Sequence, residues 1–375
     1  MDRRGENSPT HTTNVDEESS GKVFTHRDRR FDCKLTSVCP HPSGLNLYPE
    51  THTMQTQPQP IALNVGADVA KDEIVVACAE QSFAVHAIAN RRATLLTALK
   101  SLPAGSRIGM EATGSHHELL ATLAHKVGLQ VYVLNPQDTR HYAKAVGQRG
   151  KTDRVDAQLI ARYIAHEHAK LYPWIAPSPQ QHQLGRLLRR RGKLSKIQAA
   201  LTQSLKGLTG FSSDLKALRA RIDLTIARID AKIRTIIEAS APRQEAYSRL
   251  QSIPSVGPVV GSGLLIHLER LPFRSADAFT AFTGLDPRPE DSGEHRGRRR
   301  LSKRGPSELR RLLYIAAMSA RRTPAWKPIY EHHRAKGLAT TAALVILARR
   351  IARTAWSVYT YKTKFDPQRL TTGLT

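Results

Sequence analysis

The chain has 375 residues, 40% of them hydrophobic, which is enough for two or three domains and a sizeable core. Its 57 Lys and Arg outnumber 32 Asp and Glu, giving a formal net charge of +25. This excess argues against the neutral surface of a small-molecule enzyme and favours a polyanionic partner, either nucleic acid or an anionic membrane face. No apolar run reaches the roughly 18 residues of a membrane span, and the basic start lacks the apolar centre of a signal peptide.

Residues 1–57 differ in composition from the rest of the chain. They are rich in Ser, Thr, His and Pro, and up to Thr53 they hold seven basic and eight acidic residues, so the excess positive charge lies beyond residue 53. We expect a disordered extension here, and full activity from a protein that begins at Met54. The three cysteines, Cys33, Cys39 and Cys78, are too few for a disulfide framework and lack zinc-ligand spacing. We therefore expect a protein of a reducing cytoplasm.

A domain of mixed strands and helices is predicted over residues 58–170. Strands are expected over 61–65, 74–79, 83–88, 107–111 and 130–134, and helices over about 91–101, 115–127 and 152–165. Three strands followed by alternating helices and strands indicate a mixed sheet in an α/β domain, the element order of ribonuclease-H-like folds.

Two apolar stripes at helical spacing occupy residues 180–240, one over 184–208 and one over 215–236. Two long antiparallel helices, a coiled-coil hairpin, fit this pattern. The first stripe carries many basic residues and no acidic one. A solvated face is the plain alternative, but a face of one sign repels itself without a polyanion, so we expect it to contact nucleic acid. The candidate contacts are Arg189, Arg190, Arg191 and Lys193.

An all-helical domain is predicted over residues 245–366. Within it, 253–258 resembles the turn of a helix-hairpin-helix, in which Gly257 lets backbone amides approach a DNA phosphate, although Pro and Gly also mark ordinary turns. Residues 288–322 hold 11 basic residues against four acidic ones. The candidates for nucleic-acid binding in this region are Arg296, Arg298, Arg299, Arg300, Lys303 and Arg304.

Four acidic side chains stand at the ends of predicted elements. Asp68 follows an apolar strand, Glu111 closes another, and Asp153 and Asp156 open a helix at a spacing that places both on one face. Carboxylates in such positions can hold two divalent ions about 4 Å apart for phosphoryl transfer, and Mg²⁺ prefers oxygen ligands. Each residue taken singly is better explained as a turn or helix cap. Taken together, they predict a metal site.

Several short motifs occur in succession from residue 61 to about 366. They are Gly66–Lys71, Glu111–Gly114, Lys151–Ala157, Ile253–Pro258, Gly284–Arg288, Asp291–Gly293, Leu301–Gly305 and Leu309–Tyr314. In this order they resemble the insertion-sequence transposases of the IS one-ten (IS110) family. The chain departs from that pattern at Ala67, where isoleucine is usual, at 116–117, where two histidines replace a common aromatic residue, and at Ser255, where glycine is usual.

The resemblance implies a RuvC-like domain with an Asp-Glu-Asp-Asp set, a coiled coil, and a helical transposase domain with a nucleophilic serine. It assigns Asp68, Glu111, Asp153 and Asp156 as Mg²⁺ ligands, and Ser292 as the nucleophile that forms a phosphoserine link to DNA. It further implies donor and target DNA, guidance by a structured bridge RNA, and assembly as a dimer of dimers. The expected location is the bacterial cytoplasm, in association with the nucleoid.

Two other functions remain open at the level of sequence. A RuvC-like structure-selective nuclease, such as a junction resolvase, would use the same carboxylates, although Ser292 and the long C-terminal half argue against it. A non-enzymatic nucleic-acid-binding protein would depend on charge alone. A Ser-Gly pair is also common in turns, and His295 is a weak candidate for the base that a serine nucleophile needs.

Overall fold

The computed structural model describes residues 62–80, 85–112, 114–150, 152–288, 297 and 299–373. The chain divides into two units, Met1–Gln57 and Pro58–Thr375, and every described residue lies in the second. The predicted extension over 1–57 therefore lies outside the described residues, as does Ser292. None of the helices in the described ranges combines the length and apolarity that a membrane crossing requires.

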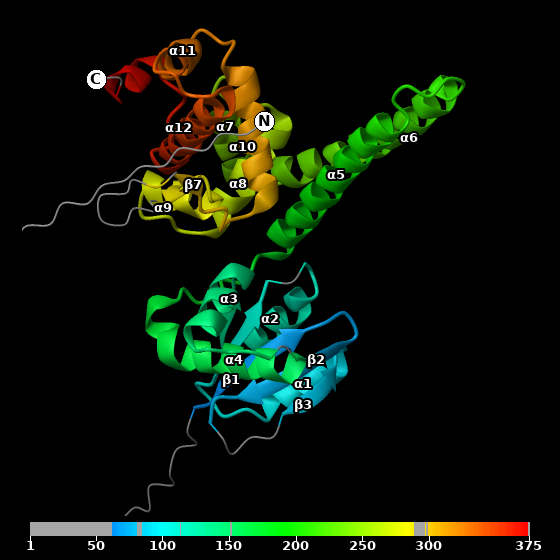
Figure 1. The fold of residues 1–375 in the computed structure, drawn as a ribbon, viewed down its shortest axis with the longest axis vertical. Helices are drawn as coiled ribbons and strands as arrows, with labels where there is room; N and C mark the ends of the chain where they lie inside the picture. The colour runs from blue at the N-terminus through cyan, green and yellow to red at the C-terminus, as the bar shows by residue number, and fades with distance from the viewer. Residues whose placement is uncertain are drawn as a thin grey trace, which may run out of the picture. The chain divides into compact units, whose positions relative to one another are not determined.

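A five-stranded mixed sheet occupies the first part of the described unit, with the strand order β3-β2-β1-β4-β5 (Figure 1). In the centre, β1 pairs antiparallel with β2 and parallel with β4, and β4 pairs parallel with β5. The element order is the ribonuclease-H-like one that the sequence predicts. The strands are β1 (Asn64–Val69), β2 (Glu73–Cys78), β3 (His86–Ala89), β4 (Arg107–Glu111) and β5 (Gln130–Leu134).

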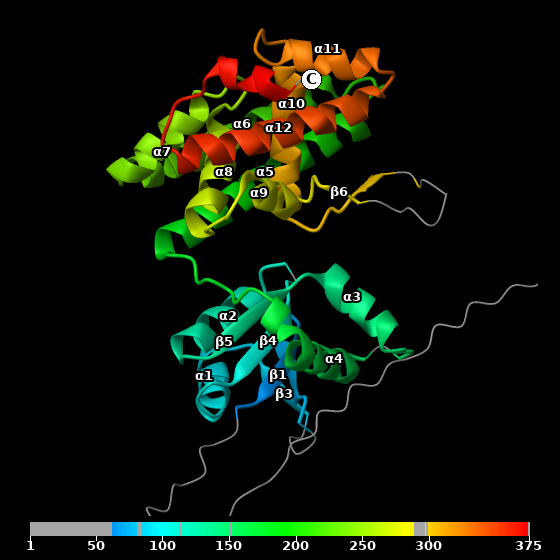
Figure 2. The ribbon, with the colours of Figure 1, turned by 90° about the vertical axis from the view of Figure 1, so that its left-hand side faces the viewer.

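Four helices accompany this sheet, and α4 packs across β1, β2 and β4 (Figure 2). Two glycines on the central strands allow the close approach, because Gly66 faces the backbone of α4 and Gly109 faces its isoleucine side chains. Thr152 caps the start of α4 by accepting a hydrogen bond from the Val155 amide. The helices are α1 (Arg92–Lys100), α2 (His117–Lys126), α3 (Pro136–Ala145) and α4 (Asp153–Glu167).

The segment after α4 runs along the outer edge of β5. The Trp174 amide donates a hydrogen bond of 2.7 Å to the Val131 carbonyl, and the indole packs against the core of the sheet domain. The Arg270 guanidinium lies 5.8 Å from the centroid of the same ring, and it donates to the Ile175 carbonyl. The segment is therefore held by both backbone and side-chain contacts.

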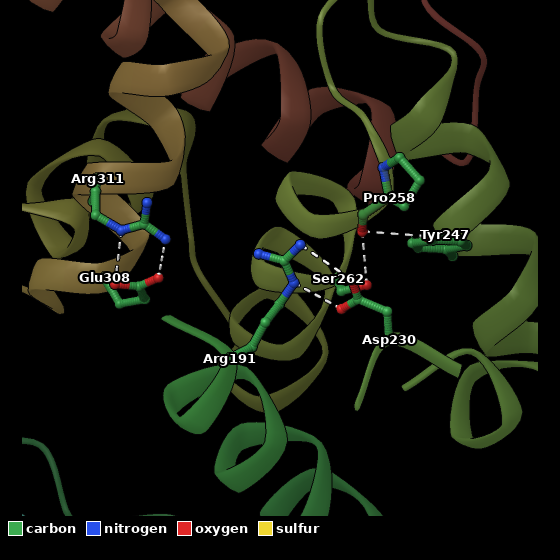
Figure 3. A network of polar contacts seen from close by, with 7 residues as sticks. All are labelled: Arg191, Asp230, Tyr247, Pro258, Ser262, Glu308 and Arg311. Carbon is green, nitrogen blue, oxygen red and sulfur yellow. Dashed lines mark hydrogen bonds and ion pairs between the residues drawn. The ribbon is translucent and has the colours of Figure 1, made fainter. Parts of the chain in front are cut away.

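Two long helices, α5 (Pro179–Ser204) and α6 (Ser212–Glu238), pack against each other as the predicted coiled-coil hairpin. Ser178 begins α5 with a capping box. Midway along α5, the Arg191 guanidinium donates to both carboxylate oxygens of Asp230, at 2.7 and 3.1 Å (Figure 3). This bidentate pair joins the two helices.

The remaining part is helical, and its core contains the fully buried Trp326, whose Nε1 donates to the Pro254 carbonyl. The longest helix of this part, α12, packs against α7, α9 and α10. The two short strands β6 and β7 pair with each other. The elements are α7 (Ala241–Gln251), α8 (Pro258–Arg270), α9 (Ala276–Thr283), β6 (Pro287–Arg288), β7 (Arg300–Leu301), α10 (Ser307–Ala320), α11 (Lys327–Ala335) and α12 (Thr340–Thr360).

Candidate active site

The parallel pairing of β1 and β4 brings two of the predicted carboxylates together. Ala67 is the register partner of Met110, and the next residue of each strand is Asp68 and Glu111. Because parallel strands point the same way, these side chains stand at one edge of the sheet. The first turn of α4 carries Asp153 and Asp156, the other two predicted ligands.

The charges of these four residues act on one another. The pKa of Asp68 is raised to about 6, first because the carboxyl is half buried and then because Asp153, Asp156 and Glu111 are negatively charged nearby. The three neighbours come from two different elements, so the raised pKa reports the convergence of β1, β4 and α4. Asp68 is thus close enough to the other three predicted carboxylates for their charges to affect it.

The position of α4 depends on the absence of a side chain at Gly66. A Cβ at this position would lie 2.0 Å from the Ala157 carbonyl oxygen and 2.3 Å from the Ala161 amide nitrogen. At Gly109 a Cβ would meet the Ile164 and Ile160 side chains at 2.8 and 3.1 Å. The helix therefore lies directly on the strands, and its first turn stands over the edge where β1 ends.

The chemistry of this donor set fits a divalent cation. All four groups are carboxylates, the hard oxygen ligands that Mg²⁺ prefers, and a cation relieves the repulsion that raises the Asp68 pKa. Within the described ranges, no group of three or more His, Cys, Asp or Glu side chains is already gathered closely enough to hold a metal ion. The residues therefore fit such an ion in the chemistry of their donor atoms.

A further residue of this site was missed by the sequence reasoning. Thr139, in the first turn of α3, donates a hydrogen bond from its hydroxyl to Oε1 of Glu111. The sequence signal for this turn was Asn135-Pro136 directly after a strand, an N-cap residue followed by proline at the first helical position. The Asn135 side chain accepts from the Gln137 amide as the cap requires.

The predicted nucleophile, Ser292, lies outside the described residues, as do Arg296 and Arg298. Arg304 is described, and its guanidinium pairs with Asp138 at 2.7 Å while its carbonyl accepts from the Asn135 side chain. A cavity of about 500 Å³ is lined by basic residues of α3 and of the β6–β7 region, namely Arg140, His141, Arg288, Arg299, Arg300 and Lys303.

The basic candidates on α5 have different surroundings. Arg189 pairs with Glu118 of α2 at 2.8 Å and is half exposed. Arg191 is only 18% exposed because of its pair with Asp230, which gives it a structural partner. Arg190 and Lys193 are exposed.

The predicted helix-hairpin-helix turn joins α7 to α8. Gly257 is the N-cap residue of α8 and makes no side-chain cap. Ser255 has a φ of 76°, in the left-handed region where glycine is favoured, and its hydroxyl is buried without a hydrogen-bond partner. The departure from the family pattern at this position therefore has a conformational cost.

Both halves of the chain match transposase families when they are compared with known proteins. Residues 65–232 match a family described as transposase, and residues 247–331 match the transposase IS116/IS110/IS902 family. The pilin gene-inverting protein of Moraxella bovis is 29% identical over 263 residues, which are 68% of this chain and 81% of the relative. A probable family 20 transposase of Pseudomonas aeruginosa is 24% identical over 346 residues, 81% of this chain and 98% of the relative.

A third relative is the transposase for insertion sequence element IS1111A of Coxiella burnetii. It is 26% identical over 286 residues, which are 68% of this chain and 76% of the relative. The two family matches succeed one another along the chain in the order of the sheet domain, the hairpin and the helical region. The chain belongs to the IS110 family of insertion-sequence transposases.

Proposed function

We propose that this transposase cuts and exchanges DNA strands with Mg²⁺ held by Asp68, Glu111, Asp153 and Asp156 and with Ser292 as the nucleophile. The observation that carries the proposal is geometric: the parallel register of β1 and β4 ends at Asp68 and Glu111, and α4, which packs on both strands, carries Asp153 and Asp156 in its first turn. The raised pKa of Asp68 agrees with this arrangement. Clustered charges of one sign repel one another in the folded state, so their convergence favours a functional role.

In this proposal, the four carboxylates hold the metal ion and nearby basic residues bind the DNA. Bound Mg²⁺ supplies positive charge that stabilises the attacking and leaving oxygens of a phosphate diester. Asp68 and Glu111 are carried by the strands, whereas Asp153 and Asp156 are carried by the first turn of α4. The basic residues around the 500 Å³ cavity would bind the phosphate backbone near these carboxylates.

In the proposed reaction, the Ser292 Oγ forms a bond to the scissile phosphorus and loses its proton. The phosphorus–oxygen bond to one sugar breaks, and that sugar oxygen takes up a proton. The sugar hydroxyl of a second DNA strand end then forms a bond to the phosphorus and loses its proton. The bond between the phosphorus and the Ser292 Oγ breaks, and the serine oxygen takes up a proton. Arginines close to Ser292 in sequence would stabilise the charge on the phosphate.

Nucleic acid guidance and assembly are further parts of the proposal. We infer that a bridge RNA pairs with donor and target DNA, so that the protein contacts mainly backbone and shape, and that the chain acts as a dimer of dimers. The Moraxella bovis relative is called a pilin gene-inverting protein, and inversion requires that cut strands be rejoined. This favours recombination over simple cleavage by a junction resolvase.

Cleavage of labelled DNA with and without Mg²⁺ tests the carboxylates. Asp153→Asn should abolish cleavage, while Asp72→Asn, at an exposed turn of the same domain, should leave it unchanged. Equal activity of the two variants would contradict the assignment. Among active proteins, rejoined exchanged strands support the recombinase, and free cut ends support the resolvase.

A nicked or half-site DNA substrate tests the nucleophile. We expect a covalent adduct that mass spectrometry places on Ser292, and Ser292→Ala should remove it while DNA and RNA binding persist. Strand exchange by the alanine variant would make the metal site alone responsible for the chemistry. Sequencing of RNA that copurifies with the protein tests the guide, and recovery of random cellular RNA alone would count against it.

A further inference from the structure

One buried hydroxyl beside the carboxylates has no role in the proposed reaction. Thr139 is 1% exposed and lies in the first turn of α3, and its Oγ1 donates to Oε1 of Glu111. The hydroxyl also lies 3.2 Å from the Pro136 carbonyl oxygen. A hydroxyl has one proton to donate, and a carboxylate is the stronger acceptor, so Glu111 takes it.

The helix that carries this hydroxyl is fixed from two sides. At its start, the Asn135 side chain caps the Gln137 amide and Pro136 occupies the first helical position. One turn further on, the ring of Tyr142 lies 4.7 Å from the ring of Tyr163 on α4. The position of Thr139 is thus set by the end of β5, which pairs with the Glu111-bearing strand β4, and by α4, which bears Asp153 and Asp156.

We propose that Thr139 is a positioning residue of the metal site, holding one oxygen of Glu111 so that the other faces the remaining carboxylates. The inference rests on the proposed function, since it assumes that Glu111 is a ligand. Groups that hydrogen-bond to metal ligands fix the orientation of those ligands, and their loss typically weakens metal binding about 10–100-fold. Thr139 itself touches no reacting atom.

The test measures metal affinity directly, by calorimetric titration of the full chain with Mn²⁺ and with Mg²⁺. Thr139→Val keeps the shape of the side chain but removes its donor, and should weaken metal binding about 10–100-fold. Thr139→Ser keeps the donor and should bind within about threefold of the parent protein. DNA cleavage by the valine variant should recover at raised Mg²⁺ concentration, because the catalytic groups are all present.

Thr280→Val is the matched control. Thr280 is 2% exposed, and its hydroxyl donates to the Ala276 carbonyl within α9, so the change removes an equally buried hydroxyl remote from the carboxylates. This variant should bind metal like the parent protein. If valine at residue 139 prevents folding, Thr139→Ala, which also lacks the donor and adds no volume, takes its place against the serine variant.

Glu111→Gln separates failure of the proposed metal site from failure of the positioning role of Thr139. If this variant loses metal binding while Thr139→Val retains it, the hydroxyl only stabilises the turn of α3 and the inference fails. If Glu111→Gln binds metal like the parent protein, the proposed carboxylate site itself is wrong. If serine fails to rescue what valine loses, the effect belongs to packing and the positioning role is refuted.

Discussion

Gly66 is where β1 and α4 approach most closely, and Gly66→Ala therefore tests how the carboxylates are brought together. The new Cβ would lie 2.0 Å from the Ala157 carbonyl oxygen, about 1.4 Å short of the 3.4 Å at which ordinary contact begins. The Ala157 oxygen belongs to the backbone and the new Cβ is fixed to the backbone of β1, so no side-chain rotation relieves the clash. The helix must move away from the strand, and Asp153 and Asp156 move with it.

The size of the effect depends on two opposing contributions. Overpacking a core costs about 1–3 kcal/mol, and a backbone clash belongs at the upper end of that range. Replacing glycine by alanine restrains the unfolded chain, which returns about 0.4–1 kcal/mol. We expect a net loss of about 2 kcal/mol. A displacement of about 1 Å at the active site also lowers cleavage about 100-fold.

Two other glycines in the same domain provide a graded series for urea unfolding. Gly109→Ala meets methyl groups of isoleucine side chains at 2.8 Å or more, a milder clash than with backbone at 2.0 Å, and should cost about 1 kcal/mol. Gly150→Ala meets nothing within 4 Å and should change stability by less than about 0.5 kcal/mol. The order of the unfolding midpoints is the measurement, and equal midpoints for Gly66→Ala and Gly150→Ala would refute the close packing of α4 on β1.

Residues outside the sheet give three more predictions. Ser255→Gly should raise the free energy of unfolding by about 1 kcal/mol, because it relieves the backbone strain of a positive φ and removes a buried unpaired hydroxyl. A lower unfolding midpoint in urea would contradict this. Arg191→Ala should lower the free energy of unfolding by about 1–2 kcal/mol, because it leaves Asp230 unpaired. The exposed Arg190, replaced by alanine, should leave stability unchanged but reduce the slope of the logarithm of the DNA-binding constant against the logarithm of salt concentration by about one. Identical behaviour of the two variants would refute the distinction. Burial, with Arg charges nearby, lowers the pKa of His267 from 6.5 to about 4. The free energy of unfolding should therefore fall by up to about 3 kcal/mol as the pH drops from 6.5 to 4, because only the unfolded chain takes up the proton there. The unfolding free energies of the parent protein and of His267→Gln in urea should diverge over this pH range, and parallel pH profiles would exclude the histidine as the cause.

The sequence predicted the fold where a pattern was local. The strands over 107–111 and 130–134 have the predicted bounds, because each is an apolar run bounded by turn residues. The coiled-coil hairpin was predicted from two stripes of Leu and Ile. The helix α3 was missed because its ten residues are mostly polar and show no apolar stripe.

Two features of the site depended on contacts that no local pattern contains. Predicted over 61–65, β1 runs instead from Asn64 to Val69. Pairing with β4 over Asn64–Ala67 and with β2 over Val65–Val69 holds Asn64, Gly66 and Asp68 in a strand despite their weak preference for it. Placing Asp68 and Glu111 side by side required the parallel register of β1 and β4. The hydrogen bond between Thr139 and Glu111 required a helix that the sequence reasoning did not predict.

The hydrogen bond from the Trp174 amide to the Val131 carbonyl has a practical consequence for dissecting this protein. Without this contact, the outer edge of β5 would expose unpaired backbone groups with which a strand of another molecule could pair. The Trp174 indole also covers apolar surface beside this edge. We therefore expect the segment around Trp174, besides connecting the sheet to α5, to limit aggregation through this edge. A fragment of the sheet domain that ends at α4 should aggregate, whereas one that extends through Ser178 should remain monodisperse.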